Sequence, residues 1–414
     1  MSETHNFAIL GGSGAGLGIA HSFLKHIKPE LDNLGKTYHL YVVDSSSHFF
    51  WSTGSPRSMV SATLLPAEKL FTPIADGFKS YDSESYTFIH GTAESWDVEG
   101  RTVTIRLADG GDIQTLPYYA LVLATGLHTP SPATSLHDNY TTSKAAIEDL
   151  NKKMASATSV IISGGGPTGV ETAGEVGHFL NGSAGWFSSR PSNPKAKVTL
   201  VTSGDKLLPV LSEARALEAE ALLNRVGVDI LYGVSVVSSV TDADGKTTVS
   251  LSNGEEWTAD VYIPAWGTTP NSEYAPAHLK NDQGYIKTNG TTLRADAAGP
   301  RVYVAGDVGD YSRGGFHNLY TALPVLATNI KRDLLAAASN KPDAKPEGLD
   351  RPFTANRSET QAVPIGPWGV GAVNGWRLPS FLIWLLKGRN YMIGNIPMTA
   401  NGDMVKRDNT VWKQ

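Results

Sequence analysis

Two glycine-rich stretches have the residue types and spacing that suit the binding of a pyrophosphate. SVIISGGGPTGVETA (159–173) carries Gly164, Gly166 and Gly169 in the pattern Gly-x-Gly-x-x-Gly after a β-branched run. Such a strand, tight turn and helix start would aim backbone N–H groups and the positive end of a helix dipole at the phosphates. This stretch therefore predicts a dinucleotide site.

FAILGGSGAGLG (7–18) has more glycines than the pattern needs, so its register is ambiguous on its own. Aligned on the later stretch, Gly11 matches Gly164, Ser13 matches Gly166 and Gly16 matches Gly169. This register predicts a second dinucleotide site in which Ser13 stands where the backbone approaches the pyrophosphate. The predicted phosphate-binding residues are Gly11, Gly12, Ser13, Gly14, Ala15 and Gly16 in the first stretch and Gly164, Gly166, Thr168 and Gly169 in the second.

The strands that follow the two stretches end differently. YHLYVVD ends in Asp44, whose carboxylate would accept hydrogen bonds from ribose hydroxyls, although a simple turn residue is the alternative. KVTLVTSGDKLL ends in Thr202-Ser203, so no carboxylate is present to repel a 2′-phosphate. Lys206 could pair with that phosphate or be an ordinary solvated lysine. NADPH is thus permitted at the second site, and NADH stays open.

Composition and charge exclude several kinds of chemistry. The 414-residue chain has no cysteine, which removes disulfides, thiolate metal sites and redox-active dithiols, and we predict no metal site. A net charge of −5 without a basic patch argues against nucleic acid as a partner. The N-terminus lacks the patterns of a secretory signal and of myristoylation, so we expect a cytoplasmic protein. LPSFLIWLL (378–386) is too short to span a bilayer but could touch one.

Two further apolar segments end in small or acidic residues. YYALVLATG (118–126) ends in Ala124-Thr125-Gly126, and RVYVAGDVGD (301–310) contains Gly306-Asp307. Together with GGGPTGVETAGE, ADVYIPAWGTTPN and the C-terminal segment from VPIGPWG to NYMIGN, they make the chain resemble the apoptosis-inducing-factor-like group of two-dinucleotide flavoprotein oxidoreductases. This group lies near the ferroptosis suppressor proteins and, more distantly, the type II NADH dehydrogenases.

The resemblance implies roles for individual residues. It implies FAD at the first site and NAD(P)H at the second, with Asp307 on the ribityl chain of FAD. It places Glu171 near the nicotinamide, and Arg57 at a position close to the flavin, where a surface or capping arginine remains the alternative. His317, which follows the Asp307 strand, could protonate a reduced quinone or tune the flavin, or be a hydrogen-bonded structural histidine.

The implied fold is α/β, with two Rossmann-like dinucleotide-binding domains and a small C-terminal α/β region. We expect an FAD-binding domain in two parts, residues 1–125 and 263–340. An NAD(P)H-binding domain is inserted between them at residues 126–262, and the C-terminal region covers residues 353–414. The C-terminal tryptophans would belong to a packed core, to a self-association or lipid contact, or to a wall over the flavin.

Hydride transfer from NAD(P)H to FAD needs positioning rather than an acid–base group. Without cysteine the flavin would reduce a small-molecule acceptor directly, and the resemblance implies a quinone. The alternative is a specialised FAD-dependent oxidase or dehydrogenase acting on a natural-product small molecule. A signalling or nucleic-acid-binding flavoprotein is a third reading that the acidic balance disfavours. A homodimer and a peripheral membrane contact through the C-terminal region stay open.

Overall fold

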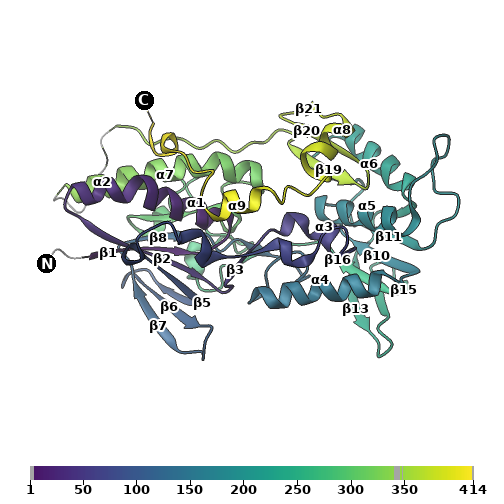
Figure 1. Cartoon of the computed structure of the whole chain (residues 1–414), viewed down its shortest axis with the longest axis horizontal. Helices are drawn as coiled ribbons and strands as arrows, with labels where there is room; N and C mark the ends of the chain where they lie inside the picture. The colour runs from purple at the N-terminus through teal and green to yellow at the C-terminus, as the bar shows by residue number, and fades with distance from the viewer. Residues whose placement is uncertain (1–3, 340–345, 347, 413–414) are drawn as a thin grey trace.

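The structure is a computed structural model that describes residues 4–339, 346 and 348–412. Figure 1 shows two lobes side by side, crossed by the C-terminal part of the chain. Residue 340, the predicted end of the second FAD-binding segment, lies outside the described residues.

The first lobe is built on a seven-stranded sheet with the order β18-β8-β1-β2-β5-β6-β7. β1 pairs in parallel with both β2 and β8, so the strand before the first glycine turn lies in the interior of the sheet. A strand buried on both faces needs a continuous apolar run, which FAIL and ALVL supply. The strands are β1 (Thr4–Leu10), β2 (Thr37–Asp44), β5 (Tyr86–Asp97), β6 (Thr102–Leu107), β7 (Ile113–Pro117), β8 (Ala120–Leu123) and β18 (Val302–Val304).

Helices α1, α2, α7 and α9 lie along this sheet on one side in Figure 1. α1 and α7 pack against each other, and α1 begins directly after the first glycine turn. β3 and β4 form a separate two-stranded antiparallel sheet, and the short α3 lies in the chain between them. The bounds are α1 (Gly14–Ser22), α2 (Lys28–Asn33), α3 (Ser55–Ser58), α7 (Phe316–Ala338), α9 (Asn395–Ala400), β3 (His48–Phe50) and β4 (Phe71–Pro73).

The second lobe repeats the pattern with a parallel sheet of order β12-β11-β10-β16. α5 starts after the second glycine turn, and a three-stranded antiparallel sheet, β13-β14-β15, completes the lobe. The bounds are α4 (Tyr140–Met154), α5 (Pro167–Asn181), α6 (Glu213–Arg225), β10 (Ser159–Ser163), β11 (Lys197–Val201), β12 (Val228–Leu231), β13 (Val236–Thr241), β14 (Thr247–Leu251), β15 (Glu256–Ala259) and β16 (Val261–Pro264).

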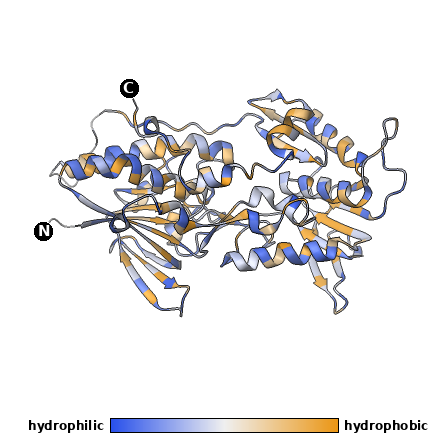
Figure 2. Ribbon diagram, viewed as in Figure 1, coloured by the Kyte–Doolittle hydropathy of each residue, from blue (hydrophilic) through white to orange (hydrophobic). Residues whose placement is uncertain are grey.

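Two short antiparallel strands, β9 (Leu127–His128) and β17 (Thr269–Pro270), pair where the chain leaves the first lobe and returns to it. Figure 2 shows hydrophobic residues gathered in the strands of both lobes. A single cluster of buried apolar side chains runs from Phe7 and Ile9 in the first lobe to Val160 and Leu200 in the second. The predicted α/β class with two Rossmann-like units is confirmed, whereas the predicted domain boundaries stay predictions.

The C-terminal region makes contact with both lobes. β19 (Gln361–Ile365) and β20 (Trp368–Val373) pack against α5 and α6. β21 (Trp376–Arg377) pairs with β20, α8 (Ser380–Ile383) packs on β19 and β20, and a helical turn over residues 384–388 follows. The chain then crosses back, and α9 packs on α1 (Figure 1). The region predicted as one small unit therefore spans the two lobes.

Candidate functional site

The two glycine turns have the same geometry. Gly11 (φ +108°) and Gly164 (φ +126°) adopt backbone conformations that favour glycine, and a Cβ on either would overlap a carbonyl oxygen, that of Ala124 or of Ala265. The end of the neighbouring parallel strand, β8 in the first lobe and β16 in the second, therefore lies directly against each turn. Gly16 and Gly169 pack in turn against the carbonyls of Gly11 and Gly164.

Ser13 and Gly166 are the N-cap residues of α1 and α5. Their φ values of −96° and −78° with ψ near 180° are extended backbone, which any residue adopts. Neither helix start is capped by a side chain, so its N–H groups are available to an anion. Serine is accommodated at position 13 because that position does not need the left-handed conformation that Gly11 needs.

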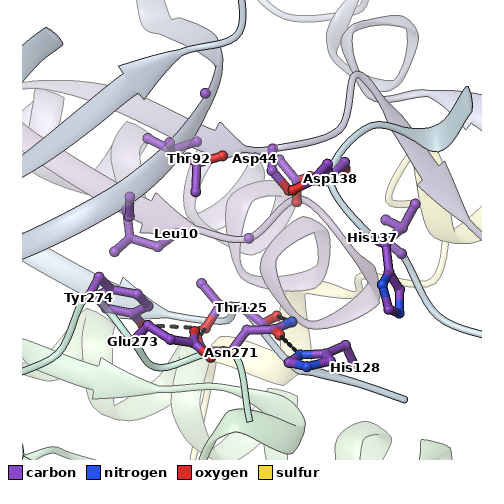
Figure 3. Close-up of a pocket in the computed structure, with 16 residues that line it drawn as sticks. Leu10, Asp44, Thr92, Thr125, His128, His137, Asp138, Asn271, Glu273 and Tyr274 are labelled. Atoms are coloured by element: carbon purple, nitrogen blue, oxygen red, sulfur yellow. Dashed lines mark hydrogen bonds between the residues drawn. The ribbon is translucent and has the colours of Figure 1, made fainter. Parts of the chain in front are cut away.

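A cavity of about 320 Å³ lies beside the first turn (Figure 3). Gly11, Asp44 and Thr125 line it, together with Thr92 of β5 and Tyr274. The Asp44 carboxylate accepts the N–H of Gly12 at 2.5 Å and that of Ser46 at 2.7 Å. Burial raises the pKa of Asp44, and these two N–H donors act to lower it. A methyl-free turn, open helix N–H groups and a carboxylate at the strand end fit the pyrophosphate and ribose of FAD.

Asn271 holds the two connecting segments together at the edge of this cavity. Its side-chain amide donates to the carbonyl of Thr125 at 2.8 Å, while the Thr125 hydroxyl donates to the Asn271 carbonyl at 2.5 Å. His128 Nδ1 lies 2.6 Å from Asn271 Oδ1, as the dashed line in Figure 3 marks. Of the predicted residues Ala124, Thr125 and Gly126, the structure brings Thr125 to the cavity. Sequence reasoning missed Asn271, although it ends the motif ADVYIPAWGTTPN.

A second cavity, of about 470 Å³, lies beside the second turn. Its lining includes residues 163–168, Thr202, Ser203 and Trp266, and no charged side chain is among the lining residues. Lys206 is not among them either, because its ammonium donates to the carbonyl of Leu211 at 2.8 Å. Its pairing with a 2′-phosphate stays a prediction. The glycine cradle and uncharged walls fit a nicotinamide dinucleotide.

Asp307 follows β18 and lies at the foot of α7. Gly306 has φ +76°, and its Cβ would meet the methyl of Ala15 on α1, so β18 delivers Asp307 beside the first glycine turn. The Asp307 carboxylate accepts the N–H of Gly315 at 3.0 Å. Burial raises its pKa. One carboxylate oxygen has no protein donor among the described residues, which fits a hydroxylated chain such as that of FAD.

Three parts of the chain meet between the lobes in a cluster of five polar residues, of which the two carboxylates and the tyrosine are buried and the two cations are partly exposed. We call Arg57, Glu171, Glu175, Lys387 and Tyr391 the interlobe cluster. Arg57 of α3 makes two parallel bonds to Glu175 of α5, at 2.9 Å from Nε and 2.8 Å from Nη2. Lys387 forms an ion pair with Glu171. The Tyr391 hydroxyl donates to Glu175 at 3.1 Å.

The electrostatics of the interlobe cluster centre on Glu171, which is 3% exposed. Burial, helped by the nearby Glu175 carboxylate, raises the pKa of Glu171 to about 7, although the Lys387 ammonium acts to lower it. A carboxyl that titrates near neutral pH can hold or release a proton under working conditions.

The structure places the two remaining candidates, Arg57 and His317, in different surroundings. Arg57 is built into the interlobe cluster, so the surface alternative is not what the structure shows. His317, the second residue of α7, is exposed, and its Nε2 lies 2.9 Å from Asn356 Nδ2. The structure brings Arg57 and Glu171 together and leaves His317 outside the cluster.

Sequence reasoning missed three residues of the interlobe cluster: Glu175, Lys387 and Tyr391. The spacing Glu171-x-x-x-Glu175 in an otherwise small and apolar helix was a usable signal, because residues four apart share a helix face. Lys387 and Tyr391 had no such signal, since they reach α5 only through the tertiary fold. Among the residues that the structure describes, no group of side chains could hold a metal ion and no helix is long and apolar enough to cross a membrane.

Comparison with known proteins gives three kinds of similarity. Residues 5–324 match the model of the family described as pyridine nucleotide-disulphide oxidoreductase. The chain is 41% identical over 400 residues to "Oxidoreductase phnG" of Penicillium herquei, covering 95% of each protein. It is 25% identical over 410 residues to ferroptosis suppressor protein 1 of Xenopus tropicalis, again over 95% of each.

A solved structure, NDH2 from Plasmodium falciparum in complex with NADH, superposes with a TM-score of 0.63 at 12% identity. The match covers 99% of this chain and 96% of that one, and it supports a shared fold.

Proposed function

Because this chain belongs to the pyridine nucleotide-disulphide oxidoreductase family, we propose that it passes hydride from NAD(P)H to FAD and electrons directly to a quinone-like small molecule. The apoptosis-inducing-factor-like recognition made from sequence motifs is confirmed by the family match and by the similarity to a ferroptosis suppressor protein. FAD and NAD(P)H are its cofactors, and it is an oxidoreductase.

The observation that supports direct transfer is the combination of two nucleotide cavities with a chain free of cysteine. The family name refers to disulphide chemistry, which this sequence cannot perform. When bound, FAD accepts a hydride from NAD(P)H and delivers two electrons to the acceptor. A quinone would leave with those two electrons and two protons, one derived from the hydride and one taken up from water by way of His317.

The chain's own residues would bind, orient and supply protons. Backbone N–H groups of Ser13, Gly14 and Ala15 would hold one pyrophosphate, and those of Gly166 and Thr168 the other. Asp44 would hold the adenosine ribose and Asp307 the ribityl hydroxyls. Glu171 would lie on the nicotinamide side. His317, exposed at the start of α7, is proposed as the residue that hands a proton to the reduced acceptor.

Anaerobic mixing with each coenzyme, followed by a panel of quinones, tests this proposal. We expect the flavin absorbance to bleach with NADPH or NADH and to recover when a quinone is added. Bleaching without recovery by any quinone would reject the quinone acceptor and favour an oxidase or dehydrogenase that acts on another small molecule. If neither coenzyme bleached the flavin, the hydride-transfer proposal itself would fail.

We also propose that the C-terminal region touches a membrane surface, in a cytoplasmic protein. The side chains of Phe381, Trp384, Leu385 and Leu386 are 67%, 39%, 50% and 57% exposed on one short helical segment. An exposed apolar strip with a tryptophan suits the interface of a bilayer, where lipid-soluble quinones are found.

Sedimentation with phosphatidylcholine vesicles tests this membrane contact. The variant Phe381→Ser/Leu385→Ser is expected to lose most of the vesicle-bound fraction, and equal binding of the two proteins would contradict the contact. Whether the chain forms a homodimer stays a prediction.

A further inference from the structure

Helix α5 buries two carboxylates on the same face. Glu171 and Glu175 are four residues apart, so their side chains lie one above the other, and both are 3% exposed. Two buried like charges this close destabilise each other unless each has its own cation. The chain supplies one cation to each carboxylate, and the two cations come from different segments.

Arg57 neutralises the charge of Glu175. Its guanidinium bonds to both carboxylate oxygens in the bidentate geometry that arginine favours, and its Nη1 donates to the carbonyl of Arg389 at 3.0 Å. The same guanidinium lies 4.7 Å from the centre of the Tyr391 ring. Since Glu175 is neutralised by Arg57, the ammonium of Lys387 is left for Glu171.

The segment that carries Lys387 is held in place four residues later. Tyr391 is fully buried, its hydroxyl donates to Glu175, and its carbonyl accepts the indole N–H of Trp51 at 2.9 Å. Tyr391 and Met392 adopt φ values of +51° and +59°, which are costly for side chains of this size. A strained backbone of this kind persists only where surrounding contacts hold it.

From this geometry we propose that Arg57, Glu175 and Tyr391 are positioning residues that fix the charge balance and the place of the Glu171–Lys387 pair. The C-terminal segment, which supplies Lys387 and Tyr391, is then part of the hydride-transfer site. This inference rests on the proposed function, because it assigns a purpose to Glu171 at the nicotinamide side.

The charged groups around Glu171 predict opposite effects for two substitutions. Lys387 and Tyr391 face it from the C-terminal segment, Glu175 from its own helix and Arg57 from α3, with His178 one turn beyond Glu175. In Arg57→Met, Glu175 loses its cation, repels Glu171 and competes for Lys387, so Glu171 should bind its proton more tightly. In Glu175→Gln, the repulsion disappears and Arg57 becomes an uncompensated cation, so Glu171 should bind its proton less tightly.

The first measurement is the pH dependence of flavin reduction by NADH in stopped flow, between pH 5.5 and 9. We expect a midpoint near pH 7 in the unmodified protein and no midpoint in Glu171→Gln. Arg57→Met should raise the midpoint and Glu175→Gln should lower it, each by about one pH unit, the usual size for loss or gain of a neighbouring charge. Tyr391→Phe should lower the rate about threefold or more with a smaller shift, and Arg57→Lys should restore part of the unmodified behaviour.

The second measurement does not depend on activity. A carboxyl whose pKa is raised on folding lowers the stability of the fold as pH rises from its ordinary value of 4.5 through 7. The melting temperature of the unmodified protein relative to Glu171→Gln should therefore fall over that range and stay level above it. The upper end of the fall should move up in Arg57→Met and down in Glu175→Gln.

The matched control is Arg294→Met. Arg294 also makes a bidentate bond to a carboxylate, Asp333, at 2.8 Å from both nitrogens, but it lies outside the interlobe cluster. It should lower the melting temperature without moving either pH midpoint. Shifts of Arg57→Met and Glu175→Gln in the same direction, or shifts no larger than in Arg294→Met, would overturn the inference, as would a flat profile for the unmodified protein.

If neither coenzyme reduces the flavin, the proposed function fails, and the melting series still decides whether the cluster controls Glu171.

Discussion

At the scale of single residues, the structure explains why some glycines of the two turns are replaceable and others are not. Gly11 and Gly164 combine a positive φ with direct contact to the next strand, whereas Ser13 and Gly166 have extended backbone. The irregular serine in the first turn is thus compatible with a pyrophosphate site. The requirement for glycine comes from backbone crowding, and the ligand needs only the free N–H groups beyond it.

Substitution of the crowded glycine should remove FAD. In Gly11→Ala the new methyl would overlap the carbonyl of Ala124 in a strained backbone conformation, so we expect at least a tenfold lower flavin content after purification. Ser13→Gly is the control and should keep its flavin. The ratio of absorbance at 450 nm to 280 nm measures both. Full flavin content in Gly11→Ala would show that the turn rearranges without cost.

The uncharged lining of the second cavity predicts little discrimination between the two coenzymes. We expect kcat/KM for NADPH and NADH to agree within about tenfold, since neither a carboxylate nor a cation lines the cavity. Ser203→Glu should reduce kcat/KM for NADPH by tenfold or more through repulsion of the 2′-phosphate and leave NADH nearly unchanged. Lys206→Met should change little, because its ammonium is engaged by Leu211. A selective loss of NADPH in Lys206→Met would instead support the pairing predicted from sequence.

At the scale of elements, the helix α1 that begins at the first glycine turn is clamped by the C-terminal helix α9. His21 of α1 is fully buried, with Nδ1 2.8 Å from the Tyr81 hydroxyl and Nε2 2.8 Å from the carbonyl of Ala400. These partners suit a neutral ring that accepts from Tyr81 and donates to Ala400. The end of the chain therefore helps to hold the helix that would bind the pyrophosphate of FAD.

This clamp predicts a loss of stability in acid. Burial lowers the pKa of His21 to about 4 from its ordinary 6.5. As pH falls, the unfolded chain binds the proton before the folded chain does. The contribution of neutral His21 to the free energy of unfolding is therefore fully present above pH 6.5. It is lost as pH falls toward 4, and the loss reaches about 3 kcal/mol. His21→Gln should show a shallower fall of melting temperature between pH 6.5 and 5 than the unmodified protein. Parallel curves for the two proteins would contradict this.

At the scale of the whole molecule, the two lobes are joined by crossing segments and by the C-terminal region. β9 and β17 pair where the chain passes between the lobes, and Asn271 fastens the same crossing to Thr125 and His128. The interlobe cluster fastens a second point. Two attachments restrict the relative motion of the lobes more than one does, which suits a reaction that needs two bound rings in contact.

Loosening the crossing should therefore affect coenzyme use more than flavin content. Asn271→Ala removes the side-chain bonds to Thr125 and His128, and we expect faster hydrogen exchange at residues 125–129 and 268–272. The rate of flavin reduction should fall severalfold while bound flavin stays near the unmodified level. Ser272→Ala, which removes only a local bond to Gly284, is the comparison. Unchanged exchange at the crossing would show that strand pairing alone holds it.

Local pattern determined the fold class, the family resemblance and the two glycine turns, because a strand, a glycine turn and a helix start are contiguous in sequence and their chemistry is carried by the backbone. The register of FAILGGSGAGLG followed from comparison with SVIISGGGPTGVETA, and the fold class and cofactors are confirmed. The acceptor, the domain boundaries and the individual site roles stay predictions.

Tertiary structure alone decided what surrounds Glu171. Glu175 shares the helix of Glu171, but Arg57, Lys387 and Tyr391 lie more than a hundred residues away in sequence, and no periodicity connects them to it. These residues depend on one another because they are shielded from water. Charges that would be independent in water must be paired where the lobes and the C-terminal segment exclude water. The tertiary fold also brings the Lys206 ammonium to the carbonyl of Leu211 and leaves His317 exposed. Neither placement could be predicted from the residue type.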